Sequence, residues 1–156
     1  MLAGGSSIEN NFGEVQLSQL SGTVYMDGNA NNRYDLGNGD APLADVRVEL
    51  HLGSNCNGPL YDTRITDADG RYSFSSLQAG MAYTICEIQP AMYGNAATNP
   101  GAGASSPAAN VIVVPSLPGA GIADNNFGEL GGALSGKVFL DQNNDGLPAG
   151  EPGLPG

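Results

Sequence analysis

Hydrophobic and polar residues alternate with a period of two along much of this chain, most clearly over residues 44–52. Consecutive side chains of a strand point to opposite faces, so this alternation predicts a half-buried antiparallel strand. Its apolar face would consist of Val46, Val48, Leu50 and Leu52. Its polar face would consist of Arg47, Glu49 and His51, which predicts an exposed histidine.

Similar patterns next to turn-forming residues predict further strands at 22–27, 71–74, 82–88, 111–114 and 126–130. We expect Tyr72, Phe74, Tyr83 and Ile85 to point inward. About seven short strands, separated by turns rich in Gly, Pro and Asn, predict an all-β fold. The expected architecture is an antiparallel β-sandwich of about 110 residues.

Residues 90–110 differ from the rest because they are mainly Ala, Gly, Ser, Pro and Asn, with few side chains to bury. We interpret this segment as a long surface loop. Such a loop is either a tip that binds a partner or a tolerated insertion.

The chain also repeats part of itself. Asn10–Glu14 (NNFGE) recurs at Asn125–Glu129, 115 residues later, and Leu20–Asp27 recurs at Leu134–Asp141, 114 residues later. Blocks that recur in the same order at this distance are typical of tandem, bead-like domains. The predicted division is a tail strand of a preceding repeat with its linker (1–17), a complete unit (18–130) and the start of a following repeat (131–156).

The loop after the first predicted strand carries oxygen-bearing side chains at positions 1, 3, 5 and 9, counted from Asp27. An EF-hand loop has this spacing, and its position 7 contributes a backbone carbonyl. Calcium takes about six to eight oxygen ligands, which this loop can offer. The alternative is a turn rich in Asp and Asn that binds no metal. The predicted ligands are Asp27, Asn29, Asn31, the carbonyl of Arg33, Asp35 and, closing the shell, Asp40.

The second copy repeats this alternation after Asp141. The equivalent ligands there are Asp141, Asn143, Asp145, the carbonyl of Leu147 and Glu151. A flexible loop with many ligands suits Mg²⁺ less well, because Mg²⁺ demands a tight octahedron. Zinc lacks ligands, since the chain has one His and two Cys. We therefore predict Ca²⁺ as the cofactor.

Charge and composition narrow the possible partners. Five Lys and Arg stand against sixteen Asp and Glu, for a net charge of −11. This balance argues against binding to nucleic acid or to an anionic membrane surface. No apolar run approaches the roughly 18 residues of a membrane-spanning helix, so we expect no membrane insertion. His51 has no nucleophile motif beside it, and Asp67 and Asp69 fit a tight turn, so we expect no enzyme.

Taken together, these segments resemble the B-type repeat of serine-aspartate repeat surface proteins, the SdrD B-like domain. The resemblance spans nearly all of residues 18–130. It implies an Ig-like, prealbumin-like sandwich, related to collagen-adhesin B-type domains, that serves as a calcium-stiffened spacer in a long bacterial cell-surface or secreted protein. It is carried by LSGTVY at 20–25, the Asp27 loop, ADVRVEL at 44–50, TDADGRYSF at 66–74, LQAG at 77–80 and YTICE at 83–87.

The resemblance also bears on covalent cross-links. For an extracellular chain, the two cysteines predict a Cys56–Cys86 disulfide. Related B-type domains often form a Lys–Asn isopeptide bond. The single lysine is Lys137, whose counterpart in the complete unit is Thr23, so we expect no such bond in that unit.

Other functions remain open beside the spacer. The strand-like ends 8–14 and 136–141 would suit a fibre or matrix subunit that assembles by strand addition between repeats. The 90–110 segment would suit an adhesin module that binds an extracellular protein or glycan. In each case the expected location is extracellular, at the bacterial cell surface, and the expected partners are neighbouring repeats or copies of the chain.

Overall fold

The computed structural model describes residues 13–132 and 138–154. In this part of the chain ten strands and no helix are found, rather than about seven strands. Most of the predicted tail strand, part of both strand-like ends and Lys137 lie outside the described residues. The strands are β1 (Leu17–Met26), β2 (Ala41–Pro42), β3 (Arg47–Leu52), β4 (Leu60–Ile65), β5 (Arg71–Gln78), β6 (Tyr83–Glu87), β7 (Tyr93–Asn99), β8 (Ser105–Ala108), β9 (Val111–Val114) and β10 (Asn126–Gly131).

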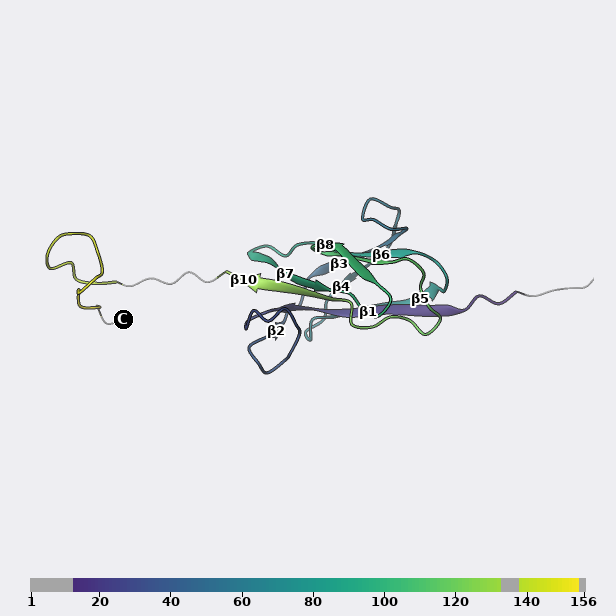
Figure 1. Ribbon diagram of the computed structural model, residues 1–156, viewed down its shortest axis with the longest axis horizontal. Coiled ribbons are helices and arrows are strands. Elements are labelled where there is room, and N and C mark those ends of the chain that lie inside the picture. The colour runs from purple at the N-terminus through teal and green to yellow at the C-terminus, as the bar shows by residue number, and fades with distance from the viewer. Residues whose placement is uncertain (1–12, 133–137, 155–156) are drawn as a thin grey trace, which may run out of the picture.

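The strands form two sheets that pack as a sandwich (Figure 1). One sheet has the order β2-β1-β10-β7, with β5 paired to residues 17–23 of β1, and the other has the order β4-β3-β6-β9-β8. Every pair of strands is antiparallel except β1 and β10, which run parallel with Val24 opposite Phe127. The predicted β-sandwich is confirmed, with this one parallel pair among its antiparallel strands. The chain enters at the start of β1 and leaves at the end of β10, so it crosses the unit from one end to the other.

The core lies between the two sheets and is built from the alternate residues that the sequence pattern selects. Tyr72, Phe74, Tyr83 and Ile85 are all buried, which confirms their predicted inward direction. The aromatic rings of Tyr72 and Phe74 meet edge to face, with centroids 5.8 Å apart. Each fully buried side chain of this size stabilises the fold by roughly 1.5–3 kcal/mol. The other core residues include Leu20, Val24, Val48, Leu50, Leu77, Ile112, Val114 and Phe127.

Residues 90–110 are not a long loop, and that prediction is wrong. β7 pairs with β10, with Asn126 opposite Asn99, and β8 pairs with β9. Both are the last strands of their sheets. Their pairing depends on backbone hydrogen bonds to a neighbouring strand. Small side chains allow this pairing but give no alternating hydrophobic pattern from which it could be predicted. Pro107 in β8 is tolerated because an edge strand has one side without a partner.

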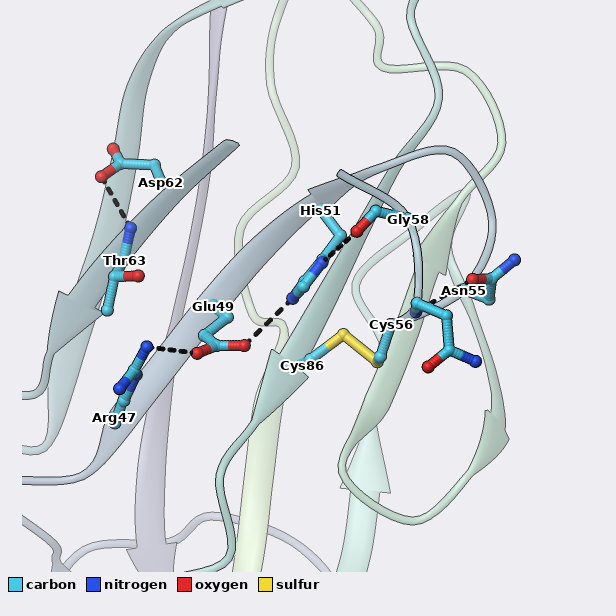
Figure 2. A network of polar contacts seen from close by, with 10 residues as sticks. Arg47, Glu49, His51, Asn55, Cys56, Gly58, Asp62, Thr63 and Cys86 are labelled. Atoms are coloured by element: carbon cyan, nitrogen blue, oxygen red, sulfur yellow. Dashed lines mark hydrogen bonds and ion pairs between the residues drawn. A yellow bond between two sulfur atoms is a disulfide. The ribbon is translucent and has the colours of Figure 1, made fainter. Parts of the chain in front are cut away.

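His51 is buried, with 7% of its surface exposed, so the prediction of an exposed histidine is also wrong. The chain that follows β3 folds back over this face, and Nδ1 of His51 lies 2.9 Å from the carbonyl oxygen of Gly58. Nε2 lies 3.1 Å from Glu49, which also pairs with Arg47 at 2.6 Å (Figure 2). The side chains on this face form a linked polar row rather than a solvated surface.

The predicted disulfide joins Cys56, in the segment after β3, to Cys86 of β6 (Figure 2). The two cysteines are 30 residues apart, so the bond closes a long loop of chain. Because β6 is a central strand of its sheet, the bond ties a surface turn to the middle of that sheet.

Replacing both cysteines, as Cys56→Ala with Cys86→Ala, is expected to lower the free energy of unfolding by about 3–4 kcal/mol. The reason is the larger conformational freedom of the unfolded chain once a loop of this length is released. Urea unfolding followed by far-UV circular dichroism measures the change. Reduction of the unaltered chain should give a similar loss, and an unchanged unfolding midpoint after reduction would contradict the prediction.

Candidate metal centre

The loop between β1 and β2, residues 27–40, begins on a buried carboxylate. Asp27 follows β1 directly, and its N–H donates to the carbonyl of Glu129 in β10 at 2.8 Å. Its two carboxylate oxygens accept the N–H groups of Asn31 at 3.1 Å and Asn32 at 2.8 Å. The backbone at Ala30 and Asn32 is left-handed, with φ of 56° and 63°. Asp27 therefore lies inside a tight curl of the backbone and organises it.

The other predicted side-chain ligands converge on Asp35. The side-chain amides of Asn29 and Asn31 each donate to its carboxylate at 3.0 Å. These hydrogen bonds, that from Asn29 first, lower the pKa of Asp35 and keep it charged at neutral pH. The Oδ1 of Asn31 also accepts the N–H of Arg33 at 2.8 Å. Positions 3, 5 and 9 of the loop are thus in mutual contact.

Asp40 closes the loop at its far end. It is buried, and its carboxylate accepts the N–H of Gly28 at 3.1 Å and that of Asp35 at 2.9 Å. Asn38, which stands at position 12, is exposed and its N–H donates to the carbonyl of Asp35 at 3.1 Å. The contacts place Asp40, rather than Asn38, at the position from which a last carboxylate would reach the loop.

The second loop, residues 141–151, is held by the same hydrogen bonds. The carboxylate of Asp141 accepts the N–H groups of Asp145 at 3.1 Å and Gly146 at 3.0 Å, in the same way as Asp27 binds its own loop. The alternating side chains of the second loop also accept backbone N–H groups. The side chain of Asn143 accepts the N–H of Asp145 at 3.0 Å, and the side chain of Asp145 accepts the N–H of Leu147 at 2.7 Å.

Glu151 corresponds to Asp40 in this scheme. It accepts the N–H of Gln142 at 3.1 Å, and Gln142 is the counterpart of Gly28. The closing acid follows 10 residues after the first aspartate in the second loop and 13 residues after it in the first. Two segments with different lengths and different closing acids reach one hydrogen-bond pattern, so the pattern comes from the alternating residues themselves.

The residues of the loop fit a hard cation in their chemistry. Carboxylates of Asp27, Asp35 and Asp40 and side-chain carbonyls of Asn29 and Asn31 are the donors that Ca²⁺ prefers. Across residues 13–132 and 138–154, no group of three or more His, Cys, Asp and Glu side chains stands together as a preformed metal cage. The oxygens of this loop now accept N–H groups, so an ion would have to take the place of the two amide contacts to Asp35.

Tyr25 and Asn99 connect the loop to the sandwich. The side-chain amide of Asn99 donates to the Tyr25 hydroxyl and to the carbonyl of Asn32, both at 3.1 Å. The ring of Tyr25 contacts Tyr34 with centroids 5.1 Å apart. Burial, followed by the negative charge of Asp27, raises the pKa of Tyr25 to about 12, so its hydroxyl stays neutral. Sequence reasoning missed Asn99 because it lies in the strand that was interpreted as a loop.

A second acidic site lies inside the sandwich, where Glu87 of β6 meets Glu129 of β10. The two side chains are 5% and 0% exposed, and they come from opposite sheets. Burial, with the neighbouring Glu129, raises the pKa of Glu87 to about 9, and burial also raises the pKa of Glu129. Glu129 accepts a hydrogen bond from Gln89. The two-residue period that places Tyr83 and Ile85 inward also includes Glu87, so the sequence contained a signal for this site.

Comparisons with known proteins give a family match and several similar solved structures. The model of the SdrD B-like domain family matches residues 18–113. Among solved structures, the shaft pilin SpaA of Lactobacillus rhamnosus GG is 16% identical, with a TM-score of 0.45 over 75% of this chain and 50% of that one. Its E269A mutant is 15% identical, with a TM-score of 0.41 over 76% of this chain and 52% of that one. The chain thus spans about half the length of these pilins. No curated protein matches the chain. Residues 13–132 and 138–154 contain no helix long and apolar enough to cross a membrane.

Proposed function

The chain belongs to the SdrD B-like domain family, and from this membership we propose that it is a structural repeat of a long bacterial cell-surface or secreted protein. In this role the unit is a spacer stabilised by Ca²⁺ in the loop after β1. The observation that carries the proposal is the shared hydrogen-bond pattern of the two loops, because each encloses the oxygen donors that such an ion binds. We assign the unit no catalytic role.

The course of the chain supports a spacer. β1 and β10 run parallel and side by side, so the chain enters the unit at one end and leaves it at the opposite end (Figure 1). Repeats joined in this way extend along a line instead of folding back on each other. The loop 27–40 follows the end of β1 and is hydrogen-bonded to Glu129, which places it at the end from which the chain leaves.

The acidic residues explain why a cation would stabilise this end. Asp27 and Asp40 are buried carboxylates, and Asp35 lies between the two amides that hold it. A bound Ca²⁺ supplies positive charge that offsets the repulsion among these groups. The residues Asp27, Asn29, Asn31, Arg33, Asp35 and Asp40 would hold the ion in this loop, and Asp141, Asn143, Asp145, Leu147 and Glu151 in the second.

Removal of calcium is expected to lower the melting temperature of the chain. At a Ca²⁺ concentration of about 100 times the dissociation constant, one bound ion adds about 2.7 kcal/mol to the free energy of unfolding. Differential scanning calorimetry with millimolar Ca²⁺, and again with excess chelator, measures the shift. Protease cleavage within residues 27–40 should increase in chelator.

Two aspartate variants sharpen this test. Asp27→Asn combined with Asp40→Asn should abolish the Ca²⁺-dependent shift, because it removes both buried charges of the loop. Asp69→Asn is the matched control, since Asp69 is an exposed aspartate in another turn, paired only with Arg71 at 3.3 Å. An unaltered chain that melts at the same temperature with and without chelator would contradict the calcium part of the proposal.

Of the other two functions that the sequence left open, the fibre hypothesis stays a prediction and the adhesin hypothesis loses support. The fibre hypothesis depends on segments 8–14 and 136–141, much of which lies outside the described residues. The adhesin hypothesis depends on a free loop at 90–110, and β7 and β8 occupy most of that segment.

A further inference from the structure

We propose that an apolar hollow at the end of the unit from which the chain leaves is the surface on which the following repeat docks. The hollow has a volume of about 250 Å³ and is lined by Met26, Ala91, Met92, Tyr93, Gly131 and Gly132. We call it the outgoing hollow. The proposal rests on the proposed function in one respect, because it takes the chain to be a tandem array.

The repeat register brings the next unit directly to this hollow. Glu14 is the counterpart of Glu129, and β1 begins at Leu17, only three residues after Glu14. Applied to the following repeat, the same spacing starts its first strand at about Gly132, which itself lines the hollow. One residue spans at most about 3.6 Å, so the link between the two units is at most a few residues long and their ends lie close together.

Met92 is presented to this contact in an unusual way. Its side chain is 93% exposed, and its backbone is left-handed with φ of 73°. A left-handed backbone is unfavourable for a residue with a Cβ, and a large exposed apolar side chain makes no compensating contact in an isolated unit. Methionine is flexible and polarisable, which suits a surface that must fit a neighbour. A partner that covers Met92 would account for both features.

The opposite end of the unit shows what the occupant offers. Met81 is exposed there. The N–H of Leu117 donates to the carbonyl of Met81 at 2.9 Å, so the segments around these two residues lie together at this end. The incoming end of the following repeat therefore offers an apolar side chain to the outgoing hollow.

The segments that would meet are uncharged, although the chain has a net charge of −11 and the acidic loop 27–40 lies at the same end as the hollow. Residues 76–81 and 116–121 at the incoming end contain no Asp, Glu, Lys or Arg, and neither do residues 88–94 and 130–132 around the hollow. Acidic segments would repel each other, whereas two uncharged apolar segments lose little solvation on contact. Covalent attachment also gives the second end a high effective concentration, so a small contact area suffices.

A two-unit chain tests the docking. Residues 1–133 run directly into residues 20–156, which keeps the repeat register because Leu20 is the counterpart of Leu134. ¹⁵N relaxation of the amides then reports whether the two units tumble as one body. We expect one shared correlation time for the unaltered pair and its loss in the first unit's Met92→Asn variant. Asparagine is used because it tolerates a left-handed backbone while removing the apolar contact.

Two controls make the outcome decisive. Leu60→Asn, at an exposed leucine on β4, should leave the shared correlation time unchanged, and Met92→Asn in the 156-residue chain should leave the melting temperature unchanged. Independent tumbling of the unaltered pair, or shared tumbling of the Met92→Asn pair, would overturn the docking surface. A melting temperature insensitive to chelator alongside shared tumbling would instead overturn only the calcium part of the proposed function.

Discussion

Replacing Glu87 with glutamine is expected to remove most of the loss of stability that the protein shows between pH 5 and pH 9. The Glu87 carboxyl is buried against Glu129 of the opposite sheet, and burial followed by that neighbour raises its pKa from 4.5 to about 9. The unfolded chain has an ordinary glutamate. At neutral pH the folded protein therefore holds a proton on Glu87 that the unfolded chain releases.

The sign of the effect follows from this difference in bound protons. Below the unfolded pKa, Glu87 is protonated in both states and its contribution to stability is complete. As the pH rises toward about 9, the unfolded state is progressively favoured, and stability falls by about 1.4 kcal/mol per pH unit for one proton. The raised pKa of Glu129 acts in the same direction. Tyr72, which lies near Glu87, remains neutral because burial raises its pKa well above the usual value.

Glutamine at position 87 keeps the shape of the side chain and is neutral at every pH. Its amide can donate to Glu129, as a protonated Glu87 carboxyl can. At pH 8 the Glu87→Gln variant should be the more stable protein, by a few kcal/mol. Urea unfolding at several pH values, in chelator so that calcium does not interfere, gives both curves.

Asp45→Asn is the matched control because Asp45 is exposed and its backbone, at φ of 61°, accepts asparagine readily. The stability of the Asp45→Asn variant should depend on pH in the same way as the stability of the unaltered chain. If the curve for Glu87→Gln ran parallel to that of the unaltered chain, the buried pair would not be the source of the pH dependence.

The sandwich itself could be predicted from the sequence because its core residues alternate. A two-residue hydrophobic period was enough to predict the inward direction of Tyr72 and Phe74 in β5. The same period predicted the inward direction of Tyr83 and Ile85 in β6. β7 could not be found in this way, since its residues are small and its position depends on β10, which lies about 30 residues further along the chain. The parallel pairing of β1 with β10 is likewise a property of the topology and not of either strand.

The candidate metal loop shows the same limit. Spacing alone identifies Asp27, Asn29, Asn31 and Asp35 as neighbours, since contacts within a short loop are local. Asn99 reaches the loop from β7, and its contact with Asn32 therefore required the fold. The prediction of an exposed His51 failed for a similar reason, because the segment that follows β3 covers its side chain.

Replacing Asn125 with alanine is expected to lower the free energy of unfolding by about 3–5 kcal/mol. Its fully buried side chain satisfies backbone groups from three parts of the chain. The amide donates to the carbonyls of Ser21 at 3.1 Å and Ile122 at 3.0 Å, and its Oδ1 accepts the N–H of Gly101 at 3.1 Å. Alanine would leave these groups without partners, and each buried unsatisfied group costs roughly 1–3 kcal/mol.

The backbone around Asn125 leaves no room for compensation. Its carbonyl oxygen accepts the Tyr72 hydroxyl at 2.5 Å, and a Cβ at Gly22 would lie 1.8 Å from the same oxygen. The segment is thus fixed between β1, β5 and the start of β10, which gives a physical reason for the Asn-Asn-Phe-Gly-Glu motif to occur at the end of the unit. Asn95→Ala, on the exposed face of β7, is the matched control and should change stability by less than about 0.5 kcal/mol. Equal unfolding midpoints for the Asn125 and Asn95 variants in urea would show that these buried contacts do not stabilise the closure of the sandwich.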